Sequence, residues 1–134
     1  MTVYHIKLYF VTLAAFLAID AVWLGLVART FYRKYLDWLM ATHPNWVAAL
    51  AFYLLFVVGV MVFVVVPGVE DGSLRMTLLK GALFGLIAYG TYDLTNLATV
   101  KNWPLTITAV DMVWGTALSV VVSYIGFTAG KWLS

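Results

Sequence analysis

The sequence predicts an all-α integral membrane protein, a single domain (residues 1–134) folded as a bundle of four transmembrane helices. Two observations predict this class. Hydrophobic residues make up 64% of the chain and charged residues 10%, whereas a soluble domain contains about 45–50% apolar and about 25% charged residues. Four segments are also apolar over the roughly 20 residues with which a helix crosses a bilayer. These segments are residues 8–28, 46–66, 78–99 and 105–127.

The first segment, residues 8–28, follows Lys7 and resembles a signal peptide in its position. Its apolar run is too long for a signal peptide, and it lacks a small-residue cleavage pattern before Arg29. We therefore expect a retained first helix. The link after it, residues 29–45, mixes aromatic and basic side chains, which is typical of the lipid headgroup region. It is either a helical extension with an aromatic belt or a specific site for anionic lipid.

The second segment, residues 46–66, has Tyr53 as its only polar side chain from Ala51 through Val66. We therefore expect this helix to pack mainly against lipid. Pro67 and Gly68 should end it, and the polar run of residues 70–73 is the clearest loop in the chain.

The third and fourth segments are separated only by residues 100–103, so their helices should form a tight antiparallel hairpin. Pro104 opens the fourth helix, where its missing amide proton does no harm. Small side chains at Gly115, Ser119 and Ser123 recur every four residues along this helix. They allow another helix to approach closely.

Three aspartates lie inside these segments without a lysine or arginine beside them: Asp20, Asp93 and Asp111. A charged carboxylate near the bilayer centre costs about 2.5–3.5 kcal/mol, so such residues mark a functional site by default. Asp93 lies nine residues before Asn102 and Asp111 nine residues after it, so the hairpin should bring both to one height. Asp20 lies nine residues before Arg29 and should fall at a similar depth.

The third helix should direct one polar face toward these acids. Its tyrosines, Asp93 and an asparagine are spaced three and four residues apart, which places them on one side of a helix. We therefore predict a layer that binds a proton or a ligand. Its six residues are Asp20, Tyr89, Tyr92, Asp93, Asn96 and Asp111.

Three interpretations of this layer are open. Its acids carry protons in a transporter, or bind a cation or small polar ligand, or form a structural knot of hydrogen-bonded neutral acids. Desolvation and mutual repulsion both disfavour three neighbouring anions, so at least one acid should be protonated near neutral pH.

Other chemistries are less well supported. His5 and His43 should lie near opposite membrane surfaces, so we expect no metal site of histidine and carboxylate. An oxygen-only site for Mg²⁺ or Ca²⁺ is left open. The chain has no cysteine, which excludes disulfides and cysteine nucleophiles. We expect no cofactor, and the net charge of +2 is too small to suggest nucleic acid as a partner.

The charges of the loops do not indicate which way the protein is oriented in the membrane. Both sides carry four basic residues, so the protein could insert in both directions. One side has Arg29, Arg33, Lys34 and Lys101, and the other has Lys7, Arg75, Lys80 and Lys131.

A sequence signature resembles a known family. The run from Tyr89 to Thr99 (YGTYDLTNLAT) is followed by Trp103-Pro104 and, at Asp111, by DMVWG. This pattern is similar to that of an uncharacterised family of small bacterial four-helix membrane proteins, known only as a domain of unknown function. The similarity extends to DAVWL at Asp20 and so covers nearly the whole chain. It implies a bacterial membrane fold, but no activity.

In length, number of spans and balanced loop charge, the chain is also similar to small multidrug-resistance exporters, which act as dimers around membrane-embedded carboxylates. The residue patterns differ, and the acids at Asp93 and Asp111 depart from a scheme with one acid per chain. This likeness is one of architecture alone.

The sequence thus favours a small multi-pass protein of the bacterial inner membrane that binds or transports a proton, a cation or a small polar ligand. Its expected partners are membrane lipids and either further copies of the chain or other membrane-protein subunits. The alternatives are an accessory subunit with structural aspartates and a lipid-modifying enzyme, of which the enzyme is less favoured.

Overall fold

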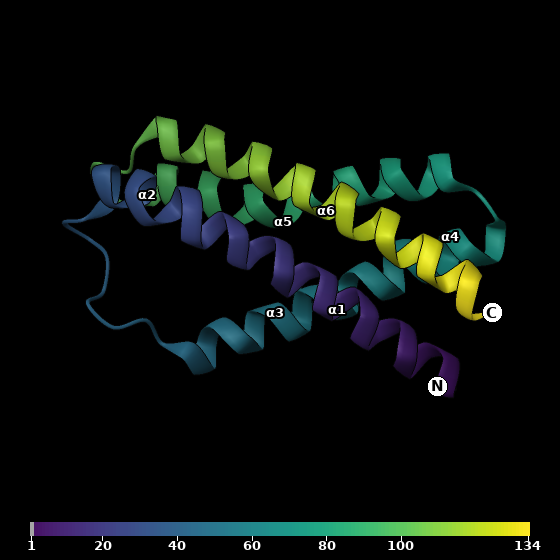
Figure 1. Cartoon of the computed structure of the whole chain (residues 1–134). Helices are drawn as coiled ribbons and strands as arrows, with labels where there is room; N and C mark the ends of the chain where they lie inside the picture. Colours follow the sequence, from purple (N-terminus) through teal and green to yellow (C-terminus); the bar gives the residue numbers. More distant parts are fainter. Residues whose placement is uncertain (1) are drawn as a thin grey trace.

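The computed structural model describes residues 2–134, which form four helical rods joined by loops (Figure 1). This confirms the predicted all-α bundle. The first two rods each contain a π-helical turn between two α-helical parts. The rods are α1 (Val3–Trp23), η1 (Leu24–Ala28) and α2 (Arg29–Leu36); α3 (Trp46–Val60), η2 (Met61–Val65) and α4 (Val66–Asp71); α5 (Leu74–Thr99); and α6 (Leu105–Leu133).

Three rods are long and apolar enough to cross a membrane: Val3–Leu36, Trp46–Asp71 and Leu105–Leu133. Each of these rods has a most apolar stretch, and little of that stretch is buried inside the protein. The buried share is 17% in the first rod and 33% in each of the other two. Most apolar side chains therefore face outward, as they do in a protein surrounded by lipid. α5 has 26 residues, a length of about 39 Å. Its polar side chains lower its hydropathy, so its crossing of the membrane stays a prediction.

The first rod continues past Arg29, where the sequence analysis places the membrane surface, and ends at Leu36. The link thus begins as a helical extension, which is one of the two alternatives above. The extension is held against the α5–α6 turn by a small aromatic core. This core consists of Leu36, Trp103 and Ile107, with Phe31, Tyr32, Tyr35 and Val100 packed on it.

The second rod also runs past its expected end. The prediction that Pro67 and Gly68 stop the helix is wrong, because α4 continues to Asp71. A proline lacks an N–H and its ring crowds the preceding turn. The π-helical turn η2 lies just before Pro67 and widens the backbone there, which accommodates the ring. The helix ends at Gly72, whose φ of +66° is a left-handed conformation that glycine adopts without strain.

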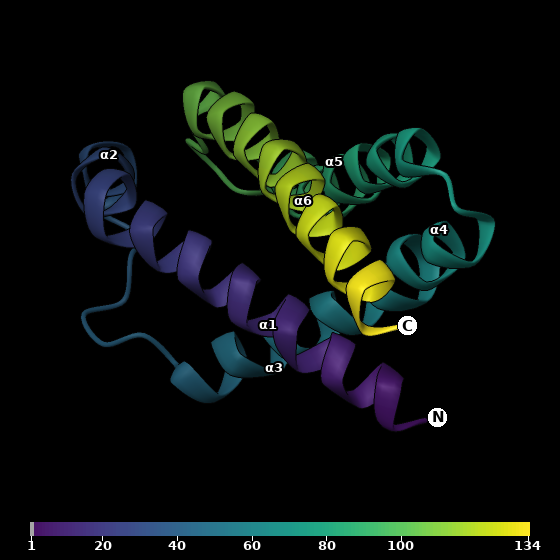
Figure 2. The ribbon, with the colours of Figure 1, turned by 45° about the vertical axis from the view of Figure 1, so that its right-hand side comes forward.

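α5 and α6 form the predicted antiparallel hairpin (Figure 2). A hydrogen bond of 3.2 Å from the Trp103 N–H to the Val100 carbonyl closes its turn. Gly85 on α5 lies so close to Gly115 and Ser119 on α6 that a methyl group there would collide with them. The small residues therefore do permit close approach, as the sequence predicts.

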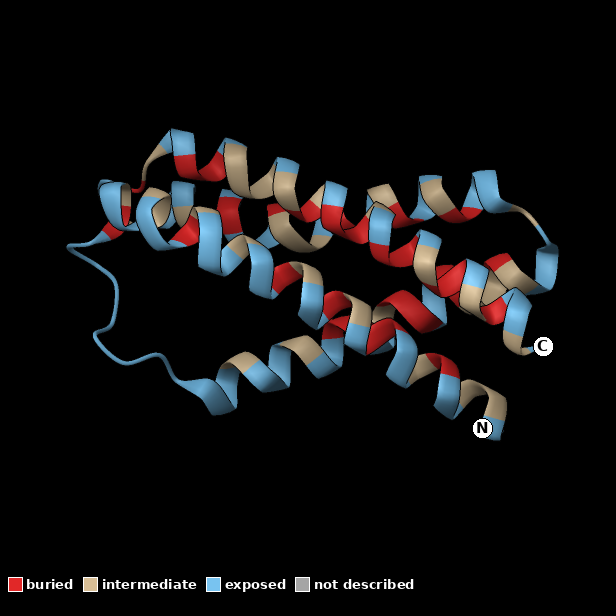
Figure 3. Ribbon diagram, in the orientation of Figure 1, coloured by how far each residue is buried: buried red, intermediate tan, exposed pale blue. Residues whose placement is uncertain are grey.

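The main core lies where α1, α3 and α6 meet. Phe16, Val57 and Val122 are buried there. The second helix is thus not purely lipid-facing, because the C-terminal half of α3 belongs to this core. Its N-terminal half is mostly exposed (Figure 3) and diverges from the other rods (Figures 1 and 2).

Candidate functional site

A cavity of about 390 Å³ lies between the rods, in the half of the bundle that holds the α5–α6 turn. All four rods contribute to its wall. Asp20 and Asp111 reach it, and within residues 2–134 its lining includes no lysine, arginine or histidine. The rest of the wall is largely aromatic. It consists of Trp23, Leu24, Ala28, Tyr32, Leu36, Met40, Ala49, Phe52, Tyr53, Tyr89, Tyr92, Trp103, Ile107 and Trp114.

Asp111 on α6 is half-buried at the edge of this cavity. The Tyr32 hydroxyl on α2 donates a hydrogen bond of 2.7 Å to its Oδ1. A hydrogen bond to a charged group contributes about 1.5–3 kcal/mol, so this contact orients the carboxyl group. It also ties the first rod to the last one.

Asp93 on α5 lies behind Asp111. Its side chain is 0% exposed, and neither carboxyl oxygen has a hydrogen-bond partner when both acids are anions. The Asp111 carboxyl group is within hydrogen-bonding reach of it. Two carboxyl groups form a hydrogen bond only if one of them is protonated. The structure thus brings Asp93 and Asp111 together across the hairpin, as their equal distances from Asn102 predict.

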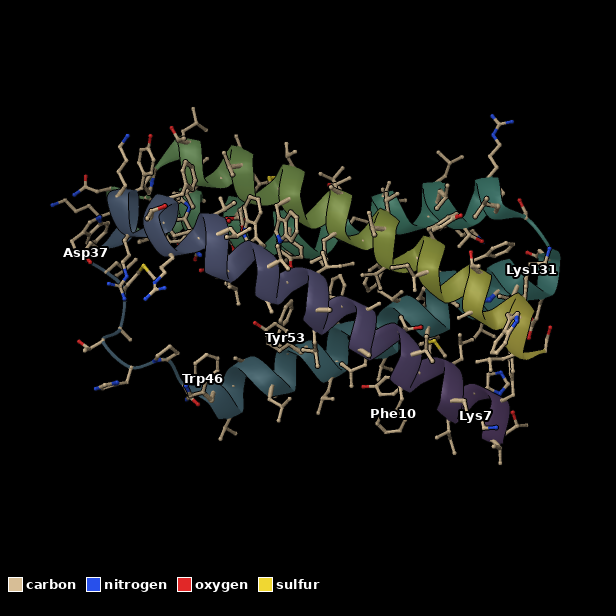
Figure 4. The ribbon with its side chains drawn as sticks, viewed as in Figure 1. Lys7, Phe10, Asp37, Trp46, Tyr53 and Lys131 are labelled. Atoms are coloured by element: carbon tan, nitrogen blue, oxygen red, sulfur yellow. The ribbon has the colours of Figure 1, made fainter. Side chains whose placement is uncertain are left out.

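Asp20 on α1 also lines the cavity. It is 8% exposed, and the Tyr53 hydroxyl and the Trp114 indole are its polar neighbours. Tyr53 lies on the side of α3 that faces α1 (Figure 4). Trp114 comes three residues after Asp111, so Asp20 lies roughly one turn, about 4.5 Å, deeper than Asp111. The predicted common depth of the three acids is therefore only approximate. The first helix continues past Arg29, so a count from Arg29 places Asp20 closer to the membrane surface than it lies.

The π-helical turn η1 brings Tyr32 and Asp20 to one cavity. The two residues are twelve positions apart, which in a regular α-helix would separate them by about 120° around the axis. A π-helical turn takes up one extra residue, which reduces this angle to about 20°. Leu24 and Ala28, at the two ends of η1, line the same cavity.

The polar face predicted for α5 is only partly directed inward. Tyr89 lines the cavity, and its ring packs on Gly115. Tyr92 also reaches the wall, but it is 57% exposed and packs edge-on against Trp103, with ring centroids 5.9 Å apart. Asn96 does not line the cavity and lies beside Tyr92. Asn96 is nearly one turn closer to the hairpin turn than Asp93, and that places it beyond the cavity.

The structure adds aromatic residues that the sequence analysis did not assign to the site. Trp23 stacks on Trp114 with ring centroids 4.1 Å apart and planes inclined by 8°. Trp23 also contacts Tyr32 edge-on, at 6.4 Å. Two features of the sequence could have indicated further site residues. Tyr53 is the only polar side chain from Ala51 through Val66, and Trp114 follows Asp111 at the spacing of one helical turn.

Among residues 2–134, no group of three or more histidine, cysteine, aspartate or glutamate side chains could hold a metal ion. What the cavity offers is two carboxyl groups, a third acid behind them, phenol hydroxyls and ring faces.

The fold and the site define a helical membrane protein with three carboxyl groups inside its bundle. A family described as "Predicted membrane protein (DUF2177)" matches residues 5–128, and the chain belongs to this family. No curated protein and no solved structure matches the chain.

Proposed function

We propose that this protein binds a cationic ligand in the cavity at Asp20 and Asp111 and exchanges it for a proton, as a small transporter or binding protein of the bacterial inner membrane. The observation that carries this proposal is the lining itself. Two carboxyl groups face a cavity whose wall has no basic side chain within residues 2–134. Such a lining favours a positive charge over a negative one.

The carboxyl groups supply most of the binding energy. A charge pair about 4 Å apart near a protein surface interacts by about 4 kcal/mol, before the cost of removing water. A cation over an aromatic face gains about 0.5–2 kcal/mol. The rings of Trp23 and Trp114 therefore shape the site and exclude water, while Asp20 and Asp111 select the sign of the charge.

The third acid provides the exchanged proton. Asp93 and Asp111 are close enough to share one proton, which satisfies the otherwise unpartnered Asp93. A cation that arrives beside Asp111 favours the anionic forms of both acids. The proton then leaves to water as the cation binds. This coupling is what a proton-driven transporter requires.

The rival function is that of an accessory subunit with structural aspartates. The hydrogen bond from Tyr32 to Asp111 supports this alternative, because a contact between distant rods stabilises a bundle whether or not a ligand binds. The two functions differ in one outcome. A structural role predicts no saturable binding of a cation.

Cation binding can be tested with tetramethylammonium and the purified protein in lipid nanodiscs. Trp23 and Trp114 stack at the cavity, so their fluorescence should change on binding. We expect Asp20→Asn and Asp111→Asn each to weaken binding at least about tenfold, while Asp71→Asn, an exposed acid outside the cavity, serves as the matched control. If the wild-type protein shows no saturable change, or if the control loses as much affinity, the proposal is wrong.

A further inference from the structure

A second cavity of about 390 Å³ adjoins the first. Four of its five lining residues, Phe52, Tyr89, Tyr92 and Asp111, also line the first cavity, and Ala88 is the fifth. The two spaces therefore meet at these shared side chains. Each is large enough for part of a small molecule, since ligand sites measure about 300–1,000 Å³.

The two cavities differ in chemistry. Asp20 and Asp111 both face the first one, whereas among residues 2–134 the second has Asp111 as its only charged group. The rest of the second wall consists of aromatic rings and the methyl group of Ala88. A ligand that fills both would place a charge between the acids and an apolar part against the rings.

The second cavity reaches the outer surface of the bundle between α3 and α5. Phe52 on α3 is 44% exposed and Tyr92 on α5 is 57% exposed, although both line the cavities. The N-terminal half of α3 diverges from the other rods at this place (Figures 1 and 2). In a membrane, this surface faces acyl chains, so the opening admits a molecule that is already dissolved in the lipid.

We infer that the ligand is an amphiphilic cation, an ammonium group on a single alkyl chain, which enters sideways from the membrane between α3 and α5. The ammonium group lies between Asp20 and Asp111, and the chain occupies the second cavity and extends into lipid. This inference rests on the proposed cation site and adds the class of ligand and its route.

The charge of the wall excludes the commoner amphiphiles of a membrane. A phosphate group beside Asp111 would meet a like charge and, within residues 2–134, no basic side chain of either cavity to offset it. Anionic phospholipids, and zwitterionic ones whose phosphate enters with the amine, are therefore disfavoured relative to an alkylammonium ion.

The test compares two probes, dodecyltrimethylammonium and tetramethylammonium, on two variants in nanodiscs. Ala88→Leu fills the second cavity and leaves the lining of the first unchanged. We expect it to weaken binding of the long-chain probe at least about tenfold and that of tetramethylammonium less than about twofold. Ala98→Leu makes the same change at an exposed position of α5 and should alter neither.

A photoreactive alkyltrimethylammonium, with a diazirine in its chain, gives a second measurement on the wild-type protein. Peptides that contain Phe52 or Ala88 should be labelled, and this labelling should disappear in Asp111→Asn and under excess tetramethylammonium. This result decides the matter even if Ala88→Leu does not fold.

The outcomes separate the two proposals. If tetramethylammonium does not bind to the wild-type protein, the cation site itself is wrong. If it binds, but Ala88→Leu leaves the long-chain affinity unchanged or the label appears only on outer residues and persists in Asp111→Asn, the amphiphile inference fails and the cation site stands.

Discussion

Asp111 has two unlike neighbours, and its role depends on both. On one side the Tyr32 hydroxyl donates a hydrogen bond of 2.7 Å to it, and on the other side stands the carboxyl group of Asp93. Asp111 already accepts a hydrogen bond from Tyr32, whereas neither carboxyl oxygen of the fully buried Asp93 has a partner, so we expect the shared proton to lie on Asp93 and to be donated to Asp111. Asp111 would then present a charge to the cavity while Asp93 stays neutral.

Tyr32→Phe tests this division of roles. The variant keeps the ring but removes the donor, so the Asp111 carboxyl group loses the hydrogen bond that orients it toward the cavity. The net contribution of one hydrogen bond is about 0.5–1.5 kcal/mol, so we expect cation affinity to fall about two- to tenfold. Titration of the purified variant with tetramethylammonium measures this, and an unchanged affinity would contradict an orienting role of Tyr32. Tyr35→Phe, which alters a tyrosine outside the cavity lining, should bind like the wild-type protein.

At the scale of the elements, the hairpin of α5 and α6 determines how the site is formed. Its short turn places Asp93 opposite Asp111, and small residues on α6 let the two helices approach. Tyr89 shows the consequence most clearly. Its ring packs directly over Gly115 and from there reaches the cavity wall. A side chain at position 115 would push α5 and its tyrosine away from α6.

Gly115→Ala should therefore destabilise the bundle. The added methyl group collides with the Tyr89 ring, and overpacking of this kind costs about 1–3 kcal/mol. Unfolding in mixed detergent micelles would measure the loss of free energy. Gly25→Ala is the matched control, since a methyl group there has open space. Equal stability of Gly115→Ala and the wild-type protein would contradict the close packing of α5 on α6.

At the scale of the whole molecule, the sequence predicts the class of fold and the hairpin, because both depend on local features. Apolar segment lengths define the rods, and counting residues from one short turn pairs Asp93 with Asp111. The positions of Tyr32 and Tyr53 depend instead on how distant rods cross and on the π-helical turn η1. Neither the order of helices around a bundle nor an extra residue in one turn leaves a periodic signal. The sequence can therefore single out Tyr53 by its polarity, but it cannot place Tyr32 or Tyr53 beside the acids.

The balanced loop charge makes a prediction for the whole chain in its membrane. Glu70→Lys with Asp71→Lys makes the end of α4, next to the loop before α5, more basic, and basic segments that flank membrane helices stay in the cytoplasm. We expect a larger fraction of molecules to have their C-terminus in the cytoplasm, as read by reporter fusions. Lysines at Asp37 and His43, in the link between the first two rods, should shift the fraction the other way. A single orientation that neither pair changes would exclude dual insertion.

The central claim, that a cation displaces a proton from the aspartate layer, is tested most directly by infrared difference spectroscopy of the carboxyl groups. We predict that the wild-type protein shows a protonated carboxyl band, that saturating tetramethylammonium reduces this band, and that Asp93→Asn folds but lacks it. A wild-type protein without such a band would contradict the claim. The claim would also be contradicted if saturating cation left the band unchanged and the Asp93→Asn variant failed to fold. The three acids would then form a structural knot of hydrogen-bonded neutral acids.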